Sequence, residues 1–154
     1  MIFQDKKEFL TNLLRKNYKL IALDVGGKKI GIAFGNVETK IVSPYKTIPV
    51  NKQTLAYLVT LMTEYQVDGV VVGLPLELTG KVGTAAKRVM KFAKELSTKT
   101  VLPITYEDER YTTTIANDLL IQIGMNRKRR AKIDDHISAK VILDSFFSSS
   151  VLQF

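Results

Sequence analysis

One aspartate and the two glycines after it are the first residues in this chain whose types and spacing could do chemistry. Asp24 closes the apolar run 20–23, and Gly26 and Gly27 follow before a second apolar run begins. A carboxylate at the end of a buried strand costs free energy unless a cation or hydrogen bonds compensate it. Glycines allow a tight turn or the close approach of a ligand. The pattern predicts a hairpin that presents Asp24 to a metal ion or a phosphate, or a turn aspartate that caps its own backbone.

A second acidic group follows a later apolar segment. Glu107, Asp108 and Glu109 are consecutive, and Arg110 comes next. Because side chains alternate along a strand, Asp108 and Glu109 should point to opposite faces, so only one can share a site with Asp24. Arg110 could neutralise the other or bind a phosphate. A solvated strand end is the simpler alternative.

Two more aspartates, Asp134 and Asp135, stand where the last helix is expected to open. Either could be the N-cap of that helix, or a third carboxylate of the same site. His136 is the only histidine, which excludes a zinc site built on two histidines. A basic run precedes these residues: Arg127, Lys128, Arg129, Arg130 and Lys132. Such a run is usually a solvated loop, but beside acidic residues it also suits a phosphate backbone.

The hydrophobic pattern predicts the elements that must position these side chains. Strands are expected over 19–25, 29–35, 40–48, 67–73 and 101–108, and helices over 3–17, 52–65, 84–97, 112–123 and 135–147. Three successive strands favour antiparallel pairing, and the later strand–helix–strand units need parallel pairing through right-handed crossovers. This order predicts an α/β fold of the ribonuclease H-like class, with a mixed five-stranded sheet (three antiparallel, then parallel strands) and helices on both faces.

The loop after the strand over 67–73 leads to a helix that is expected to begin near Gly83. Loops in this position line the working edge of parallel sheets, and a helix N-terminus can accept a phosphate. Lys87, Arg88 and Lys91 on the helix could extend the basic surface.

Composition narrows the classes of function. The chain has 154 residues, which suits one domain; we expect residues 19–150 to form it and residues 1–18 to be an N-terminal helical extension. The absence of cysteine excludes a disulfide framework and a thiolate zinc site. With no signal-peptide pattern and no apolar stretch long enough to cross a bilayer, we expect a cytoplasmic protein without a membrane partner. The net charge of +8 favours nucleic acid as the partner.

Four segments in this order resemble the YqgF (RuvX-like) family over residues 19–147. They are residues 24–33, 71–76, 108–113 and 133–135. Proteins of that family are described as Holliday-junction resolvases and as nucleases that mature the 5′ end of pre-16S ribosomal RNA. The resemblance implies a ribonuclease H-like fold and a metal-dependent acidic site.

The resemblance also implies which acidic residues of this chain form the site. The first falls on Asp24, and the second on Asp108 or Glu109, with Glu109 favoured. The third, counted back from Leu143, falls on Asp135. These four are the expected catalytic residues, and Asp24, Glu109 and Asp135 are the expected ligands of Mg²⁺ or Mn²⁺.

Nucleic-acid contacts are expected from the basic residues near these acids. They are Lys28, Lys29, Arg110, Arg127, Lys128, Arg129, Arg130 and Lys132. Two positions depart from the family pattern: Gly27 stands where threonine is usual, and Glu77 where asparagine is common. The first should loosen the turn, and the second adds an acid near the site.

We therefore expect a metal-dependent nuclease that acts on structured RNA, with the ribosomal small-subunit precursor as substrate, as a monomer or homodimer. A Holliday junction resolvase acting on branched DNA is the alternative, and it requires a dimer with paired sites. A nucleic-acid-binding module without catalysis is a further one. An actin-like ATPase also uses an Asp-x-Gly hairpin, but 154 residues are too few for its two lobes.

Overall fold

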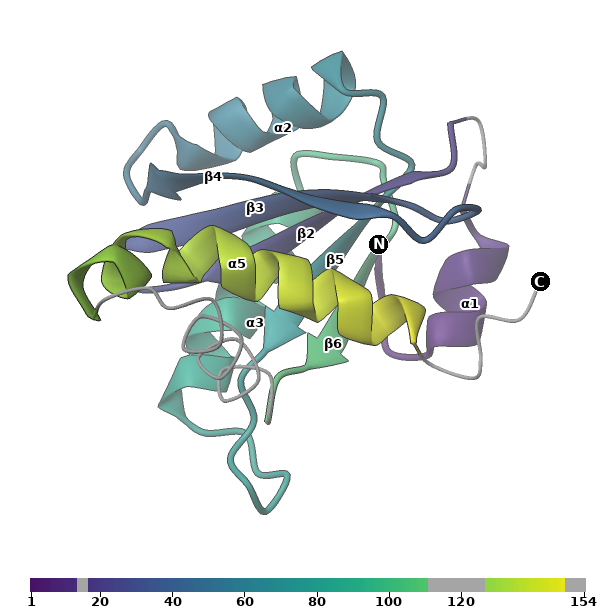
Figure 1. The fold of residues 1–154 in the computed structure, drawn as a ribbon. Coiled ribbons are helices and arrows are strands. Elements are labelled where there is room, and N and C mark those ends of the chain that lie inside the picture. The colour runs from purple at the N-terminus through teal and green to yellow at the C-terminus, as the bar shows by residue number, and fades with distance from the viewer. Residues whose placement is uncertain (14–16, 111–126, 149–154) are drawn as a thin grey trace.

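A computed structural model of the chain contains a six-stranded mixed sheet with helices on both faces (Figure 1). The structure describes residues 1–13, 17–110 and 127–148, and for residues 127–136 the backbone alone. The strands are β1 (Ile2–Phe3), β2 (Lys19–Val25), β3 (Lys29–Asn36), β4 (Val42–Pro49), β5 (Gly69–Leu74) and β6 (Ile104–Asp108). The helices are α1 (Lys6–Thr11), α2 (Thr54–Glu64), α3 (Thr84–Ser97) and α5 (Arg127–Phe147).

The strand order is β1-β6-β5-β2-β3-β4, so the first long strand of the chain lies near the centre. β2, β3 and β4 pair antiparallel, whereas β2 pairs parallel with β5, and β5 with β6. The predicted mixed sheet is confirmed, but the prediction of five strands is wrong. Ile2 and Phe3 form a sixth, which pairs parallel with Ile104 and Thr105 of β6. Two residues are too few to show the alternation by which a strand is predicted.

Each face of the sheet has its own apolar core. On one face α2 and α3 pack through residues such as Leu58 and Leu96 against Ile21 and Leu23 of β2. On the other face α5 packs through residues such as Ile142 against Leu20 and Ala22. Since neighbouring residues of β2 alternate between the two cores, the even-numbered ones, Asp24 among them, point to the face that α5 covers.

The N-terminal segment is part of the second core. The helix expected over 3–17 is shorter, because α1 covers only Lys6–Thr11; Asp5 caps it by accepting a hydrogen bond of 3.0 Å from the Lys7 amide. Phe9 is fully buried, and its ring meets that of Phe146 edge-on at 5.8 Å. The described part of residues 1–18 therefore packs into the sheet domain.

Helix α5 begins earlier than the sequence pattern indicated. It starts at Arg127, so the basic run 127–132 is helical, and the prediction of a basic loop is wrong. Asp134 and Asp135 consequently lie inside the helix, and neither is its N-cap. The helix expected over 112–123 lies outside the described residues. Within the described part of the chain, no helix is both long and apolar enough to span a bilayer.

Candidate active site

Asp24 lies in a row of residues that crosses the sheet and contains two glycines. Gly31 of β3 is its register partner, and Thr47 of β4 is the partner of Gly31. On the other side, the parallel register of β2 and β5 places Gly73 next to Asp24, and Gly73 is the partner of Glu107 of β6. Side chains in one row point to one face. The two glycines therefore leave space on both sides of the Asp24 carboxylate, beneath α5.

Glu109 fills the space over Gly73. A Cβ built at Gly73 would clash with Cδ1 of Ile142 and would lie 2.5 Å from Cδ and 2.6 Å from Oε1 of Glu109, so a side chain there would have to displace both the isoleucine and the glutamate. The Glu109 amide donates a hydrogen bond of 3.0 Å to the carbonyl of Leu74. This bond holds the residue after β6 against the end of β5, with its carboxyl group turned back over the sheet.

The carboxyl groups of Glu109 and Asp24 meet and share a hydrogen bond. Burial, then the charge of Asp24, this hydrogen bond and the charge of Asp108 raise the pKa of Glu109 to about 8. At neutral pH Glu109 therefore keeps its proton beside Asp24. Because carboxylate oxygens are the ligands that Mg²⁺ prefers, a divalent cation could take the place of that proton. The residues present fit a hard cation.

Asp108 is separated from this pair. Its Oδ2 accepts a hydrogen bond of 2.7 Å from Nε of Arg110, and its Oδ1 accepts one of 2.9 Å from the Arg110 amide. The other end of the guanidinium reaches the β5–α3 loop, where Nη1 lies 3.4 Å from a Cβ built at Gly80. In the structure, therefore, Glu109 lies against Asp24, whereas Asp108 binds Arg110 and fixes the position of its guanidinium.

The third expected acid, Asp135, is placed only by its backbone. Helix α5 lies across β2, β3 and β4 on the face to which Asp24 points, so Asp134 and Asp135 are carried on the helix that covers the site (Figure 1). His136 and the basic residues of the run 127–132 belong to the same helix. Among the side chains that the structure describes, no three acids or histidines form a metal cluster.

Glu107 has a structural role that its sequence context did not indicate. It is 7% exposed, it lies in the Asp24 row, and its Oε2 is 2.5 Å from Nζ of Lys6. Its Oε1 accepts a hydrogen bond of 3.3 Å from the hydroxyl of Ser145 in α5. Glu107 thus ties the N-terminal helix to β6 and α5. The one available signal was its position within the acidic run, and that signal favoured a solvated strand end.

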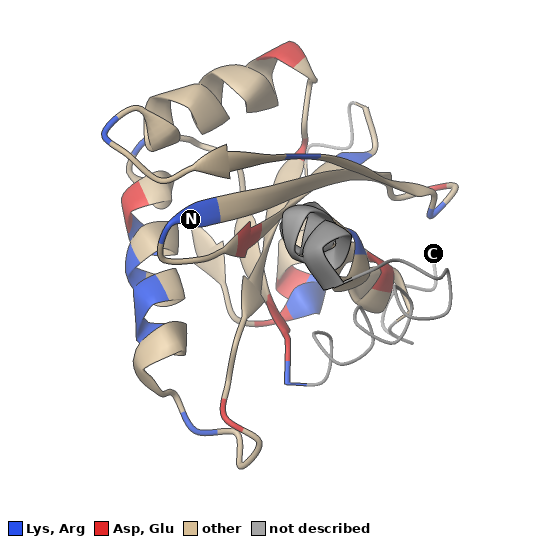
Figure 2. Cartoon of the chain, turned by 60° about the vertical axis from the view of Figure 1, so that its left-hand side comes forward, with Lys and Arg blue, Asp and Glu red and all other residues tan. Residues whose placement is uncertain are grey.

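Basic residues surround the turn between β2 and β3. Lys28 and Lys29 are exposed in it, beside the end of β2. The Gly26 amide donates a hydrogen bond of 2.8 Å to the Lys29 carbonyl, and a Cβ at Gly26 would lie only 2.8 Å from that oxygen, so the turn requires glycine there. Figure 2 shows the basic residues of this turn and of α3 on the same side of the molecule.

The N-terminus of α3 does not suit the phosphate that we expected there. The carboxylate of Glu77 lies against Gly83, the N-cap of α3, with Oε1 only 2.7 Å from a Cβ built at Gly83. A carboxylate already uses the favourable field at this helix end, and it would repel a second anion.

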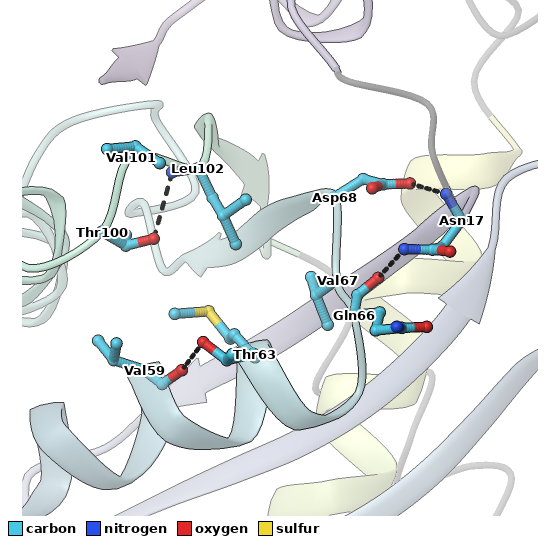
Figure 3. A pocket seen from close by; sticks show the side chains of 10 residues that line it. Asn17, Val59, Thr63, Gln66, Val67, Asp68, Thr100, Val101 and Leu102 are labelled. Carbon is cyan, nitrogen blue, oxygen red and sulfur yellow. Dashed lines mark hydrogen bonds between the residues drawn. The ribbon is translucent and has the colours of Figure 1, made fainter.

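A cavity of about 310 Å³ lies at the opposite end of the parallel strands (Figure 3). The buried Asp68 at its edge accepts hydrogen bonds from the amides of Asn17, at 2.9 Å, and of Lys19, at 3.4 Å. The carboxylate therefore ties the entry of β2 to the entry of β5. The cavity is separate from the Asp24 pair, which lies where β2 ends.

The strand order and a carboxylate pair at the end of a central strand, beneath a covering helix, define a ribonuclease H-like protein. Two solved structures support this class at the level of the fold. The fowlpox virus Holliday junction resolvase is 16% identical with a TM-score of 0.53, covering 84% of this chain and 97% of that one. Thermus thermophilus RuvC in complex with a Holliday junction substrate is 10% identical, also with a TM-score of 0.53, covering 82% and 91%.

Sequence comparison narrows the class to a family. Residues 18–149 match the RuvX family, which is described as a Holliday junction resolvase. Proteins named "Putative pre-16S rRNA nuclease" from Rickettsia conorii and Rickettsia canadensis are each 42% identical over 151 residues, covering 97% of both chains. The chain belongs to the RuvX family, as the sequence motifs predicted. Because these alignments leave out only 3% of the chain, they include most of residues 1–18.

Proposed function

We propose that this RuvX-family protein is a metal-dependent nuclease that cuts structured RNA, with the precursor of 16S ribosomal RNA as its substrate. The observation that carries the proposal is the hydrogen-bonded pair of Asp24 and Glu109 beneath α5. Two acids from distant parts of the chain meet in a space that Gly73 leaves open. Such convergence is costly for folding alone, because burial and then the charge of Asp24 raise the pKa of Glu109.

Asp24 and Glu109 would hold Mg²⁺ or Mn²⁺, with Asp135 as the third ligand from α5. A divalent cation bound there supplies an activated water and stabilises the negative charge on the departing oxygen. Arg110, held by Asp108, would bind a phosphate of the substrate and fix its position. The basic residues of the β2–β3 turn and of the run 127–132 would bind the flanking backbone.

The choice of RNA rests on the relatives and on charge. The Rickettsia proteins are named as nucleases of pre-16S rRNA, and they match nearly the whole chain. The net charge of +8 suits a polyanion of either kind. Since ribosomal RNA is processed where ribosomes are assembled, we place the protein in the cytoplasm.

Cleavage of a pre-16S 5′ leader by purified protein in Mg²⁺ tests this function. We expect Asp24→Asn and Glu109→Gln each to lower the rate at least about a hundredfold, as loss of an essential charged group does. Asp144→Asn is the matched control, because Asp144 is a half-exposed acid that pairs with Lys140 away from the site. Equal cutting by wild type and Asp24→Asn would assign the activity to a contaminant. Tight RNA binding without cleavage in any divalent ion would leave a binding module.

Resolution of a Holliday junction is the second candidate, because the RuvX family carries that description. A symmetric cut of a four-way junction requires two sites related by a twofold axis, hence a dimer. Incubation of the protein with a labelled junction and with the RNA leader, in the same buffer, separates the two. Paired cuts in the junction together with a dimer in sedimentation would support resolution. A monomer that cuts RNA alone would exclude it.

A further inference from the structure

An arginine of α3 reaches the turn that follows Asp24. A Cβ built at Gly27 would lie 3.4 Å from Nη1 and 3.7 Å from Cζ of Arg88, so the guanidinium lies directly against this turn. Gly27 has no left-handed φ and the backbone does not require glycine there. A Cβ at this position would only touch the guanidinium, but the further atoms of a branched side chain would compete with it for the space beside the end of β2.

Arg88 leads a row of cations along α3. Ala86, Val89, Ala93 and Leu96 turn the inner side of this helix to the core. Lys87, Arg88, Lys91 and Lys94 are exposed on the remaining sides. At 1.5 Å per residue these four span roughly 10 Å along the helix, which is a length comparable to two phosphate spacings of a nucleic-acid strand. Figure 2 shows this side of α3 next to the β2–β3 turn.

In the described part of the chain, Arg88 takes part in none of the ion pairs, which join Lys6 to Glu107, Arg110 to Asp108 and Lys140 to Asp144. An exposed guanidinium beside a glycine turn adds little to stability. Its planar fork of N–H donors does, however, match the geometry of a phosphate.

We propose that Arg88 binds a backbone phosphate of the nucleic-acid substrate at the turn that follows Asp24, and that Lys87, Lys91 and Lys94 continue this contact along α3. This rests on the proposed function, since it names how the same site grips its substrate. The substrate strand would leave the site across the β2–β3 turn and run over the outer side of α3. Gly27 has no branched side chain that would compete with the guanidinium for the space beside the turn.

Binding without cleavage tests the contact. The affinity for a labelled RNA duplex is measured by fluorescence anisotropy in EDTA, between about 50 and 200 mM salt. Each neutralised phosphate contributes about 0.9 to the slope of log affinity against log salt on a duplex. We expect Arg88→Ala to reduce this slope by about 0.9. When salt rises from about 50 to 200 mM, the variant should therefore lose affinity by a factor about 3.5-fold smaller than wild type does. Arg88→Lys should keep the slope and bind less tightly than wild type, because it loses the fork.

Two further variants separate the position of Arg88 from its charge. Lys99→Ala removes the same charge from an exposed position beyond the far end of α3 and should change neither slope nor affinity. Gly27→Val keeps every charge but fills the space beside Nη1, and should weaken binding by displacing the guanidinium. In the Mg²⁺ cleavage assay, Arg88→Ala should raise KM several-fold with little change in kcat.

The outcomes separate this inference from the proposed function. If Arg88→Ala and Lys99→Ala shift slope and affinity equally, Arg88 makes no specific contact, and the inference is wrong even when wild type cuts RNA. If wild type neither binds nor cuts nucleic acid, both the function and the contact are wrong. A loss confined to Arg88→Ala and Gly27→Val supports the contact.

Discussion

Replacing Glu109 by glutamine should change how the stability of the metal-free protein depends on pH. In the folded protein the pKa of Glu109 is raised from its ordinary value of 4.5 to about 8. A carboxyl group whose pKa is raised on folding stabilises the protein below pH 4.5, and that contribution is lost as the pH rises through 8. Glutamine cannot ionise, and its amide can donate a hydrogen bond to Asp24 as the protonated acid does. The variant should therefore lack this pH dependence.

The difference between the two pKa values corresponds to about 5 kcal/mol at 1.36 kcal/mol per unit. That is an upper limit, since a buried carboxylate pair relaxes and admits water when it ionises. We expect Glu109→Gln to be more stable than wild type by about 2–3 kcal/mol at pH 8.5, and similar to it at pH 4.5.

Urea unfolding in EDTA across this pH range measures the effect, with the free energy of the variant compared to that of wild type at each pH. Asp144→Asn serves as the control, because Asp144 lies half-exposed and pairs with Lys140. The reasoning fails if the wild-type and Glu109→Gln stabilities run parallel from pH 4.5 to 8.5. Parallel curves would mean that Glu109 ionises in the folded protein as it does in the unfolded chain.

Three other predictions concern the same face. Calorimetric titration of wild type with Mg²⁺ at pH 7 should release close to one proton per protein, seen as a heat that varies with the buffer; Glu109→Gln should release none. Gly73→Ala should displace Glu109, lowering cleavage at least about tenfold and stability by about 1–3 kcal/mol, with thermal melts and leader cleavage as the measurements; unchanged cleavage would contradict the close fit. Lys6→Met leaves Glu107 buried without its cation and should lower the free energy of unfolding in urea by about 3 kcal/mol. The double variant Lys6→Met, Glu107→Gln should recover most of this loss. A double variant no more stable than Lys6→Met would refute the ion pair.

The parts of the fold that follow from periodicity could be predicted from the sequence. The central strands alternate or run apolar over five or more residues, and three in succession lead to an antiparallel meander. Helix α3 was also predictable, and it has the predicted bounds, Thr84–Ser97. Strand β1 could not be predicted, because Ile2 and Phe3 become a strand only by covering the open edge of β6.

The start of α5 was missed for an electrostatic reason. Four consecutive positive charges at 127–130, with a fifth at Lys132, repel one another, and such a run is usually taken for a solvated loop. Arg and Lys are nevertheless good helix formers, and the apolar residues that follow Asp135 anchor the helix to the sheet. The tertiary contact of residues such as Ala139 and Ile142 offsets the repulsion in the preceding turns.

The alternation of side chains along β6 narrowed the choice of the acid that faces Asp24, but it did not identify that acid. It predicted that Asp108 and Glu109 could not both face Asp24, which agrees with the geometry. It could not say which of the two does, because Glu109 lies past the end of the strand, where alternation no longer applies. The isolated glycines Gly31 and Gly73 were the unused signal, since a glycine inside a strand often marks the close approach of another group.

Two glutamates at the end of β6, the buried Glu107 and the partly buried Glu109, have different roles in stability and in the proposed chemistry. Glu107 and Glu109 both reach the face that α5 covers, two residues apart. The N-terminal helix supplies Lys6 to Glu107, and this ion pair keeps that carboxylate at the edge of the sheet. Glu109 is brought instead to a second acid, Asp24, and burial together with the charge of Asp24 raises the pKa of Glu109. If both glutamates served stability alone, each would be expected to pair with a cation, as Glu107 does with Lys6. The acid–acid contact lowers the stability of the metal-free protein at neutral pH, and the divalent cation that we propose would offset that loss by binding between the two groups.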